Sequence, residues 1–292
     1  MKKFKKVEKS TLDIDTILKV EELFKSKSWE IDDNENEMSR FHRFCCMLDK
    51  LNEKEKELIL ELSSRFIVIG FNDYLNKLQI ALEKLYNDPE LEVNEESILY
   101  IMPLISPTDK GKTKSSNFML YLLKSGALNY NNNLYPENFI YIEQNLPQGI
   151  NSTKKNQFLV LVDDFIGTGE TAEECLRPLF RKAIVKEKTV VLSLVAQESG
   201  IDKINNLGVK VISAIIVKKG ITDFYEEEES KDKKGIMKQI EDRIKINSQY
   251  RLGYKESEGL VSMIRTPDNT FPIFWHEDKR MMNIAPFPRG QT

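Results

Sequence analysis

The sequence predicts a doubly wound α/β core built around a mainly parallel, five-stranded sheet. Two observations lead to this fold class. Short apolar runs rich in β-branched residues recur through the middle of the chain, at residues 97–105, 138–144, 158–162, 188–196 and 209–217. Helix-forming segments or gaps of helix length separate these runs, as parallel crossovers require. Helices should therefore cover both faces of the sheet.

Three segments between these runs have the composition of helices. SSNFMLYLLKSGA, residues 115–127, should form a helix that ends at Gly126. A second helix should begin after the Gly/Thr-rich turn that follows Val162 and continue to about Lys182. ESGIDKINNLG, which follows the fourth run, should form a short third helix. Each helix would return the chain to the start of the next strand.

The N-terminal region, from about residue 11 to residue 95, has a helical pattern. Leu58, Leu62 and Phe66 recur every fourth residue, and a second stripe is formed by Leu75, Leu78, Leu82 and Leu85. This spacing places each set on one face of a helix, where it would pack into a core. Asn72 or Asp73 would cap the second helix. We expect residues 1–95 to be a helical N-terminal region and residues 96–222 to be the α/β core.

The remaining residues, 223–292, should form a C-terminal helix and a segment rich in aromatic residues. The charged run 226–234 has the composition of a solvated connection, and Ile236, Ile240 and Ile244 mark an amphipathic helix beyond it. The aromatic side chains that follow have two interpretations. Phe271, Phe274 and Trp275, with Asn269, could stack on a flat ring, but aromatic residues more often fill a core, which is the interpretation we favour.

Composition excludes several classes of protein. The formal net charge is −3, so no overall basic field indicates nucleic-acid binding. No apolar run approaches the ~20 residues that span a bilayer, and no secretory signal is present, so we expect a cytoplasmic protein. The chain has 3 cysteines and 2 histidines and no CxxC pair, which argues against a disulfide framework and against a zinc site.

Two adjacent acids and a glycine-rich turn follow the third apolar run. Asp163 and Asp164 stand at the carboxyl end of this strand, where ligands of open parallel sheets bind. A carboxylate in this place needs a partner that donates hydrogen bonds or carries positive charge. Residues 167–171, Gly-Thr-Gly-Glu-Thr, would aim backbone amides at a point in front of the next helix, which favours a phosphate. Alternatively, the acids only cap the helix.

Val160–Thr171 resembles the phosphoribosyl pyrophosphate signature of type I phosphoribosyltransferases, which have an α/β core of the predicted kind. The resemblance implies that Asp163 and Asp164 hold the ribose 2′- and 3′-hydroxyls, directly or through Mg²⁺, and that residues 167–171 hold the 5′-phosphate. The phosphoribosyl-binding residues would be Asp163, Asp164, Ile166, Gly167, Thr168, Gly169, Glu170 and Thr171. The flanks are similar to phosphoribosyltransferase-like proteins of bacterial conflict and antiphage gene clusters.

The loop after the first strand, residues 106–116, is a second candidate anion site. The resemblance implies that Lys110, Gly111, Lys112 and Thr113 bind pyrophosphate. Gly111-Lys112-Thr113 also ends a near P-loop pattern in which Ser106 replaces the first glycine, so a nucleoside triphosphatase is an alternative. A solvated, lysine-rich loop without a ligand is a further alternative.

The resemblance also implies a mobile catalytic flap in residues 143–157, where Lys154 or Lys155 would close over the pyrophosphate. Two functions are compatible with it. One is a Mg²⁺-dependent transfer of phosphoribosyl to or from a base, for which the similarity of the flanks implies a role in antiphage defence. The other is a regulatory module that senses phosphoribosyl pyrophosphate or a nucleotide without turning it over. The N-terminal helices would then contact a second copy of the chain or a partner protein.

Overall fold

The computed structural model describes residues 12–31, 39–94, 96–109, 111–125, 140–146, 156–182, 184–277 and 284–290. Two compact units make up the chain. One comprises residues 69–218, and the other combines residues 1–68 with residues 219–292. We call the first the α/β unit and the second the terminal unit.

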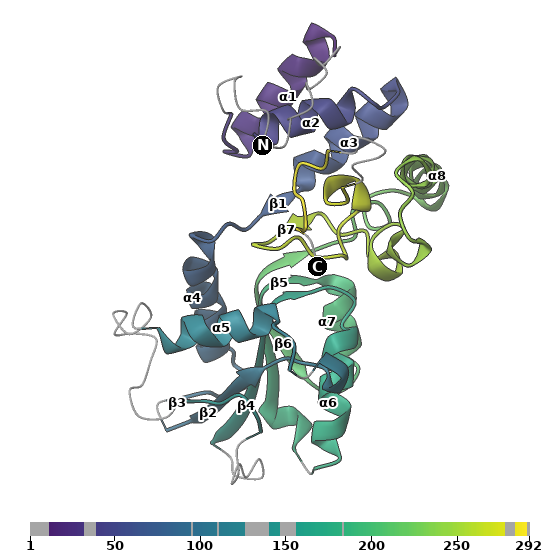
Figure 1. Ribbon diagram of the computed structural model, residues 1–292. Coiled ribbons are helices and arrows are strands. Elements are labelled where there is room, and N and C mark those ends of the chain that lie inside the picture. Colours follow the sequence, from purple (N-terminus) through teal and green to yellow (C-terminus); the bar gives the residue numbers. More distant parts are fainter. Residues whose placement is uncertain are drawn as a thin grey trace. The chain divides into compact units, whose positions relative to one another are not determined.

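The α/β unit contains the predicted five-stranded sheet (Figure 1). Its strands are β2 (Ile98–Pro103), β3 (Ile140–Ile142), β4 (Gln157–Ile166), β5 (Thr189–Gln197) and β6 (Lys210–Val217). All neighbouring strands run parallel, in the order β3-β2-β4-β5-β6. The predicted fold class is therefore confirmed. Strand β4 is central and pairs with both β2 and β5, and its apolar residues 158–162 are fully buried.

Helices cover both faces of this sheet, as the parallel pairing predicts. They are α4 (Asp73–Tyr86), α5 (Ser115–Lys124), α6 (Glu170–Phe180) and α7 (Glu198–Asn205), with 3₁₀ turns at Pro107–Asp109 and Lys186–Lys188. Helices α4 and α5 lie on one face and α6 and α7 on the other (Figure 1). The apolar residues of α6 pack with Leu159, Leu161 and Val191 from the sheet. All three helices expected between the strands are present.

Helix α4 belongs to this sheet, although its sequence position suggested the N-terminal helical region. It packs against β5 and β6, and Lys84 donates hydrogen bonds to the carbonyl oxygens of Ser213 and Ala214, each at 2.9 Å. The α/β unit therefore begins at residue 69 rather than at residue 96. The physical reason is that the sheet needs a helix over the outer half of this face, and the leucine stripe of α4 supplies it.

The terminal unit joins both ends of the chain. Its helices are α1 (Ile14–Ser26), α2 (Arg40–Leu48), α3 (Glu53–Arg65) and α8 (Glu227–Arg243). Strand β1 (Ile67–Val68) pairs in parallel with β7 (Val261–Ser262), and 3₁₀ turns occupy Ser248–Tyr250, Tyr254–Glu256 and Pro272–Phe274. Residues 1–95 and 223–292 were expected to be separate regions, but one apolar cluster includes residues from both.

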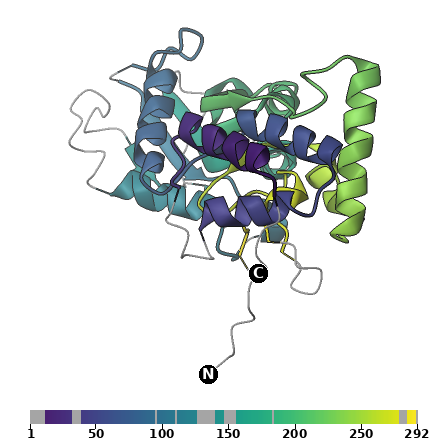
Figure 2. The same ribbon diagram turned by 90° about the horizontal axis from the view of Figure 1, so that it is seen from above.

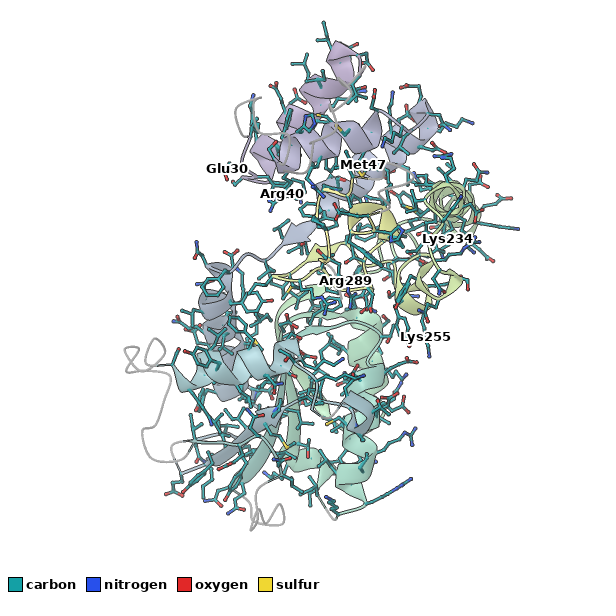
Figure 3. All side chains as sticks on the ribbon, in the orientation of Figure 1. Glu30, Arg40, Met47, Lys234, Lys255 and Arg289 are labelled. Carbon is teal, nitrogen blue, oxygen red and sulfur yellow. The ribbon has the colours of Figure 1, made fainter. Side chains whose placement is uncertain are left out.

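Aromatic residues join the two ends in this cluster. The ring of Phe66, at the end of α3, stacks on Phe287 with centroids 4.5 Å apart and touches Phe274 at 4.8 Å. Near the C-terminus, Arg289 pairs with Asp268 at 3.1 Å and lies over the ring of Trp275 (Figure 3). Burial of such rings supplies much of the stability of a small core.

Helix α8 begins earlier than its sequence suggested. The charged run 226–234 was expected to be a solvated connection, but the helix starts at Glu227 and continues unbroken to Arg243 (Figure 2). The acidic residues that open it lie at the positive end of the helix dipole, where negative charge is stabilising. Glu229 and Lys233 form an i,i+4 ion pair at 3.5 Å. A run of mixed charge can therefore continue a helix as readily as interrupt it.

Candidate active site

The two acids lie within the paired part of strand β4, near its carboxyl end, and not in the loop that follows it. Asp163 pairs in register with Ser193 of β5, and the ladder continues to Ile166. Asp164 is buried, with 7% of its surface exposed, and Asp163 is half-buried. The acids are therefore held on a strand that is paired on both sides, which favours a site of fixed geometry.

Each acid accepts hydrogen bonds from a helix that packs on the sheet. The hydroxyl of Ser115, the first residue of α5, donates to Oδ1 of Asp163 at 2.8 Å, and the Asp164 amide donates to the same oxygen at 2.9 Å. The hydroxyl of Tyr74, in the first turn of α4, donates to Oδ2 of Asp164 at 2.7 Å. Within the described part of the chain, no basic side chain forms an ion pair with either acid.

Among the described residues, no positively charged group balances the negative charge of the acid pair. The pKa of Asp163 is raised well above its ordinary value, chiefly because burial disfavours the charged form and then because Asp164 is negative and close. The hydrogen bond from Ser115 opposes this shift. A cation or a group that donates hydrogen bonds would therefore be stabilised here, and binding it would favour the charged form of Asp163.

The turn between β4 and α6 exposes a set of backbone amides. Gly169 precedes α6 in the left-handed conformation, with φ of +76°, which glycine adopts without strain. In the described part of the chain, the amides of Gly167, Thr168, Gly169 and Thr171 donate no hydrogen bond. Because these amides lie at the positive end of an 11-residue helix, they could hold an anion such as phosphate.

Helix α7 packs tightly against this turn through a residue that sequence inspection did not single out. A Cβ atom at Gly200 would lie 2.1 Å from the carbonyl oxygen of Gly167, and one at Gly169 would lie 2.9 Å from the carbonyl oxygen of Gly200. Only residues without a side chain allow the two backbones to approach so closely. The available signal was a glycine inside a short helix, where glycine is otherwise unfavourable.

Glu170 carries a negative charge at the start of α6, where it would oppose phosphate binding. Lys203 of α7 lies 3.7 Å from Glu170 Oε1 and 2.9 Å from Glu173 Oε2. The ammonium group lowers the pKa of Glu173, as does the neighbouring Arg177. The acids of the first helical turn are therefore paired with cations from the protein, which reduces their repulsion of an anion.

The lysines of the loop between β2 and α5 turn toward an acid of the same loop. Asp109 accepts from Lys112 at 2.7 Å and pairs with Lys114 at 2.5 Å, and these contacts lower its pKa. Gly111 has φ of +88°, so glycine suits this position. Lys110 lies outside the described residues. Helix α5 starts only at Ser115, and it is Ser115, not a lysine, that contacts the acid pair.

Two other predicted positions have clear outcomes. Lys154 and Lys155, the candidates for a flap, lie outside the described residues. Phe271, Phe274 and Trp275 are buried in the core of the terminal unit, and the indole of Trp275 donates to the carbonyl oxygen of Thr270 at 2.7 Å. Their packing role, which we favoured, is confirmed, and stacking on a ligand ring is excluded because the rings have no free face.

Mg²⁺ fits the donor set at the acid pair. Among the described residues no group of three or more His, Cys, Asp or Glu side chains could hold a metal ion. Mg²⁺ does not need such a cage, since it keeps several waters and binds through one or two carboxylates and the phosphate oxygens of a substrate. The half-buried carboxyl group of Asp163, whose pKa is raised, beside the carboxyl group of Asp164 is compatible with that mode.

Comparisons with known proteins identify the family of the chain. The family model PRTase-CE matches residues 8–289. Among solved structures, orotate phosphoribosyltransferase from Aeropyrum pernix is 17% identical, with a TM-score of 0.28, over 50% of this chain and 71% of that protein. No relative was found among curated proteins. In the described part of the chain, no helix is both long and apolar enough to cross a membrane.

Proposed function

The chain belongs to the PRTase-CE family of type I phosphoribosyltransferase-like proteins, and on this premise we propose that it binds phosphoribosyl pyrophosphate, or a nucleotide carrying ribose 5-phosphate, together with Mg²⁺. One observation carries the proposal. The amides of residues 167–171 that donate no hydrogen bond in the described part of the chain follow an acid pair of which Asp164 is buried. This arrangement supports a phosphate site beside a diol site on one strand and the turn after it.

The roles of the residues follow from their chemistry. The amides of Gly167, Thr168 and Gly169 would hold the 5′-phosphate at the positive end of α6. Asp163 and Asp164 would accept hydrogen bonds from the ribose hydroxyls or bind Mg²⁺. When bound, Mg²⁺ would stabilise the charge of the departing pyrophosphate. In transfer, the C1–O bond to pyrophosphate would break and a bond from C1 to a base would form.

Binding without transfer is the second candidate function. The observation that favours it is the pairing of both Lys112 and Lys114 with Asp109, because these lysines would have to leave that acid to bind pyrophosphate. A P-loop triphosphatase is not carried forward, because the family match is to phosphoribosyltransferase-like proteins and that reading leaves residues 168–171 without a role.

Calorimetric titration with phosphoribosyl pyrophosphate and Mg²⁺ tests the binding site. We expect saturable binding to the wild type, and loss of it when Asp163→Asn and Asp164→Asn are combined. The double variant should remain folded, because it removes two like charges from a buried place. Asp202→Asn, an exposed acid on α7 in the same unit, is the matched control and should bind normally. Equal affinity in the double variant would contradict the assignment.

Pyrophosphate release in the presence of a panel of bases separates the two functions. Turnover supports transfer, whereas saturable binding without release supports a sensor. A base that reacts would also identify the acceptor, which the fold does not determine.

A role in antiphage defence rests on the resemblance of the flanks to conflict-associated proteins, and a cytoplasmic location stays an expectation from the sequence. Cells that express the wild type should resist phage better than cells that express the double aspartate variant. The predicted association through the N-terminal helices stays a prediction. Helix α1 exposes Ile14 and Leu18, which are four residues apart and so lie on one face. Sedimentation of the wild type would measure it.

A further inference from the structure

Tyr74 is a buried donor fixed against the acid pair. Its side chain is 1% exposed, and its hydroxyl donates to Oδ2 of Asp164 at 2.7 Å. Its ring meets Phe118 of α5 edge to face, with centroids 5.6 Å apart and an interplanar angle of 61°. Contacts on both the ring and the hydroxyl restrict rotation of the side chain, so the donor has a defined position.

The acid pair has four carboxylate oxygens, and the protein occupies two of them. Oδ1 of Asp163 accepts from Ser115 and from the Asp164 amide, and Oδ2 of Asp164 accepts from Tyr74. Among the described residues, no hydroxyl, amide or basic group donates to Asp163 Oδ2 or to Asp164 Oδ1, and the two carboxyl groups hydrogen-bond each other, which adds to the raised pKa of Asp163. A ligand that replaces this mutual contact would therefore find one oxygen on each aspartate.

Two remaining acceptors match a ligand group with two neighbouring donors. A ribose diol has two adjacent hydroxyls, whereas 2-deoxyribose has only one of them. A site built to bond a hydroxyl strongly rejects the analogue that lacks it, because a buried polar group is then left without a partner. The hydrogen bond from Tyr74 to Oδ2 of Asp164 fixes the carboxyl group, so that Oδ1 can accept a hydrogen bond from a sugar hydroxyl.

We propose that Tyr74 is a positioning residue of the sugar site. By holding Oδ2 of Asp164 it fixes the orientation of that carboxyl group, whose other oxygen can accept from a ribose hydroxyl, so that the site takes ribose in preference to 2-deoxyribose. This inference rests on the proposed function, since it deepens the specificity of the same site.

The first test compares two sugar phosphates on the wild-type protein. Ribose 5-phosphate and 2-deoxyribose 5-phosphate are titrated separately in the presence of Mg²⁺. We expect ribose 5-phosphate to bind about tenfold tighter or more, the ratio for one lost hydrogen bond to a charged group. This comparison needs no variant, so it holds even where a substitution disturbs folding.

The second test separates positioning from packing. Tyr74→Phe should weaken ribose 5-phosphate binding about fivefold or more while leaving the affinity for inorganic phosphate unchanged, because the turn at residues 167–171 is intact. Tyr86→Phe is the matched control. It removes a buried hydroxyl from the same helix, and that hydroxyl has no hydrogen-bond partner in the described structure. It should change neither affinity.

The outcomes distinguish this inference from its premise. Equal wild-type affinity for the two sugar phosphates, or unchanged ribose 5-phosphate affinity in Tyr74→Phe, would overturn the inference and leave the proposed function standing. Parallel loss of inorganic phosphate binding in Tyr74→Phe would show a packing role and would also overturn it. If the wild type binds neither sugar phosphate, the proposed function fails and this inference fails with it.

Discussion

Gly200, in the first turn of α7, shows how a residue with no functional group can shape a binding site. Its Cα approaches the carbonyl oxygen of Gly167 so closely that a methyl group would lie 2.1 Å from that oxygen. Since both contacting groups are backbone, neither can rotate away. The position of the turn proposed to bind phosphate therefore depends on this glycine as well as on the turn's own residues.

Gly200→Ala should move the turn. We expect a cost of about 1–3 kcal/mol in the free energy of unfolding, the range for overpacking a close contact, together with weaker binding of phosphoribosyl pyrophosphate. Urea denaturation and calorimetry measure the two effects. Wild-type affinity in this variant would show that the turn adapts, and that the amides bind without the support of α7.

Glu241 of α8 makes the stability of the terminal unit depend on pH. Its side chain is fully buried, and burial raises its pKa to about 8, although the Leu252 amide, Arg251 and Lys238 favour the charged form. Both carboxyl oxygens lie 3.0 Å from the Leu252 amide nitrogen. Asp242, next in sequence, adds to the upward shift.

The sign of the effect follows from proton linkage. In the unfolded chain the pKa of a glutamate is about 4.3. Between pH ~4.3 and pH 8, Glu241 therefore binds more protons in the folded state than in the unfolded state. The stabilisation is complete below the unfolded pKa and is lost as pH rises through 8. Urea midpoints from pH 5.5 to pH 8.5 should therefore fall with pH. Glu241→Gln should flatten that slope, and an equal slope in the variant would contradict the assignment.

At the scale of elements, α8 illustrates a local preference that tertiary packing overrides. Gly235 lies in the middle of this 17-residue helix, where glycine is unfavourable, and no atom lies within 4 Å of the place where its Cβ would be. The helix is held instead by its buried face, which includes Met237 and Ile240, and by ion pairs such as Lys234 with the buried Glu258 at 3.0 Å.

Gly235→Ala should stabilise the protein by about 0.5–1 kcal/mol, because alanine restricts the unfolded chain and finds open space in the helix. An increase in the urea midpoint measures it. Gly235→Ala and Gly200→Ala are the same substitution in two helices, and we expect opposite changes in the free energy of unfolding. The reason is that a Cβ atom at Gly200 would meet a backbone carbonyl oxygen, whereas one at Gly235 would meet no atom within 4 Å. Destabilisation would show that Gly235 has a contact outside the described chain.

On the scale of the whole molecule, each of the two units has its own apolar cluster. Residues of α1–α3, α8 and the C-terminal aromatic segment form one cluster, and residues of the sheet with α6 and α7 form the other. The chain passes between the units at residues 68–69 and 218–219. Separate cores commonly unfold in separate transitions, since cooperativity depends on shared contacts.

Phosphoribosyl pyrophosphate with Mg²⁺ should therefore stabilise one unit selectively. The proposed site lies wholly in residues 69–218, so saturating ligand should raise the melting temperature of that unit, by the mass-action effect of binding to the folded state alone. Differential scanning calorimetry should resolve a second transition that does not move. If a single transition moves as a whole, the two units unfold together.

Much of the α/β unit was predictable, because its signals are local. Apolar β-branched runs identify buried parallel strands, and the turn after Val162 follows from glycines and from acids at a strand end. Predictions that used the composition of a whole segment, such as a solvated connection at residues 226–234, were less accurate. The run 226–234 is helical because Glu and Lys are good helix formers that pair at i,i+4, and its charge alone did not exclude a helix.

The sequence by itself determined the parallel sheet, the acid pair and the turn that follows it, because each depends on residues adjacent in the chain. Only the tertiary structure decided which distant residues complete the site and which do not. Tyr74, Ser115 and Gly200 reach the acids and the turn from three different helices, while the C-terminal rings pack into a core with α1–α3. The physical reason is that contacts between segments far apart in sequence are selected by packing of the whole fold, and no local pattern records them.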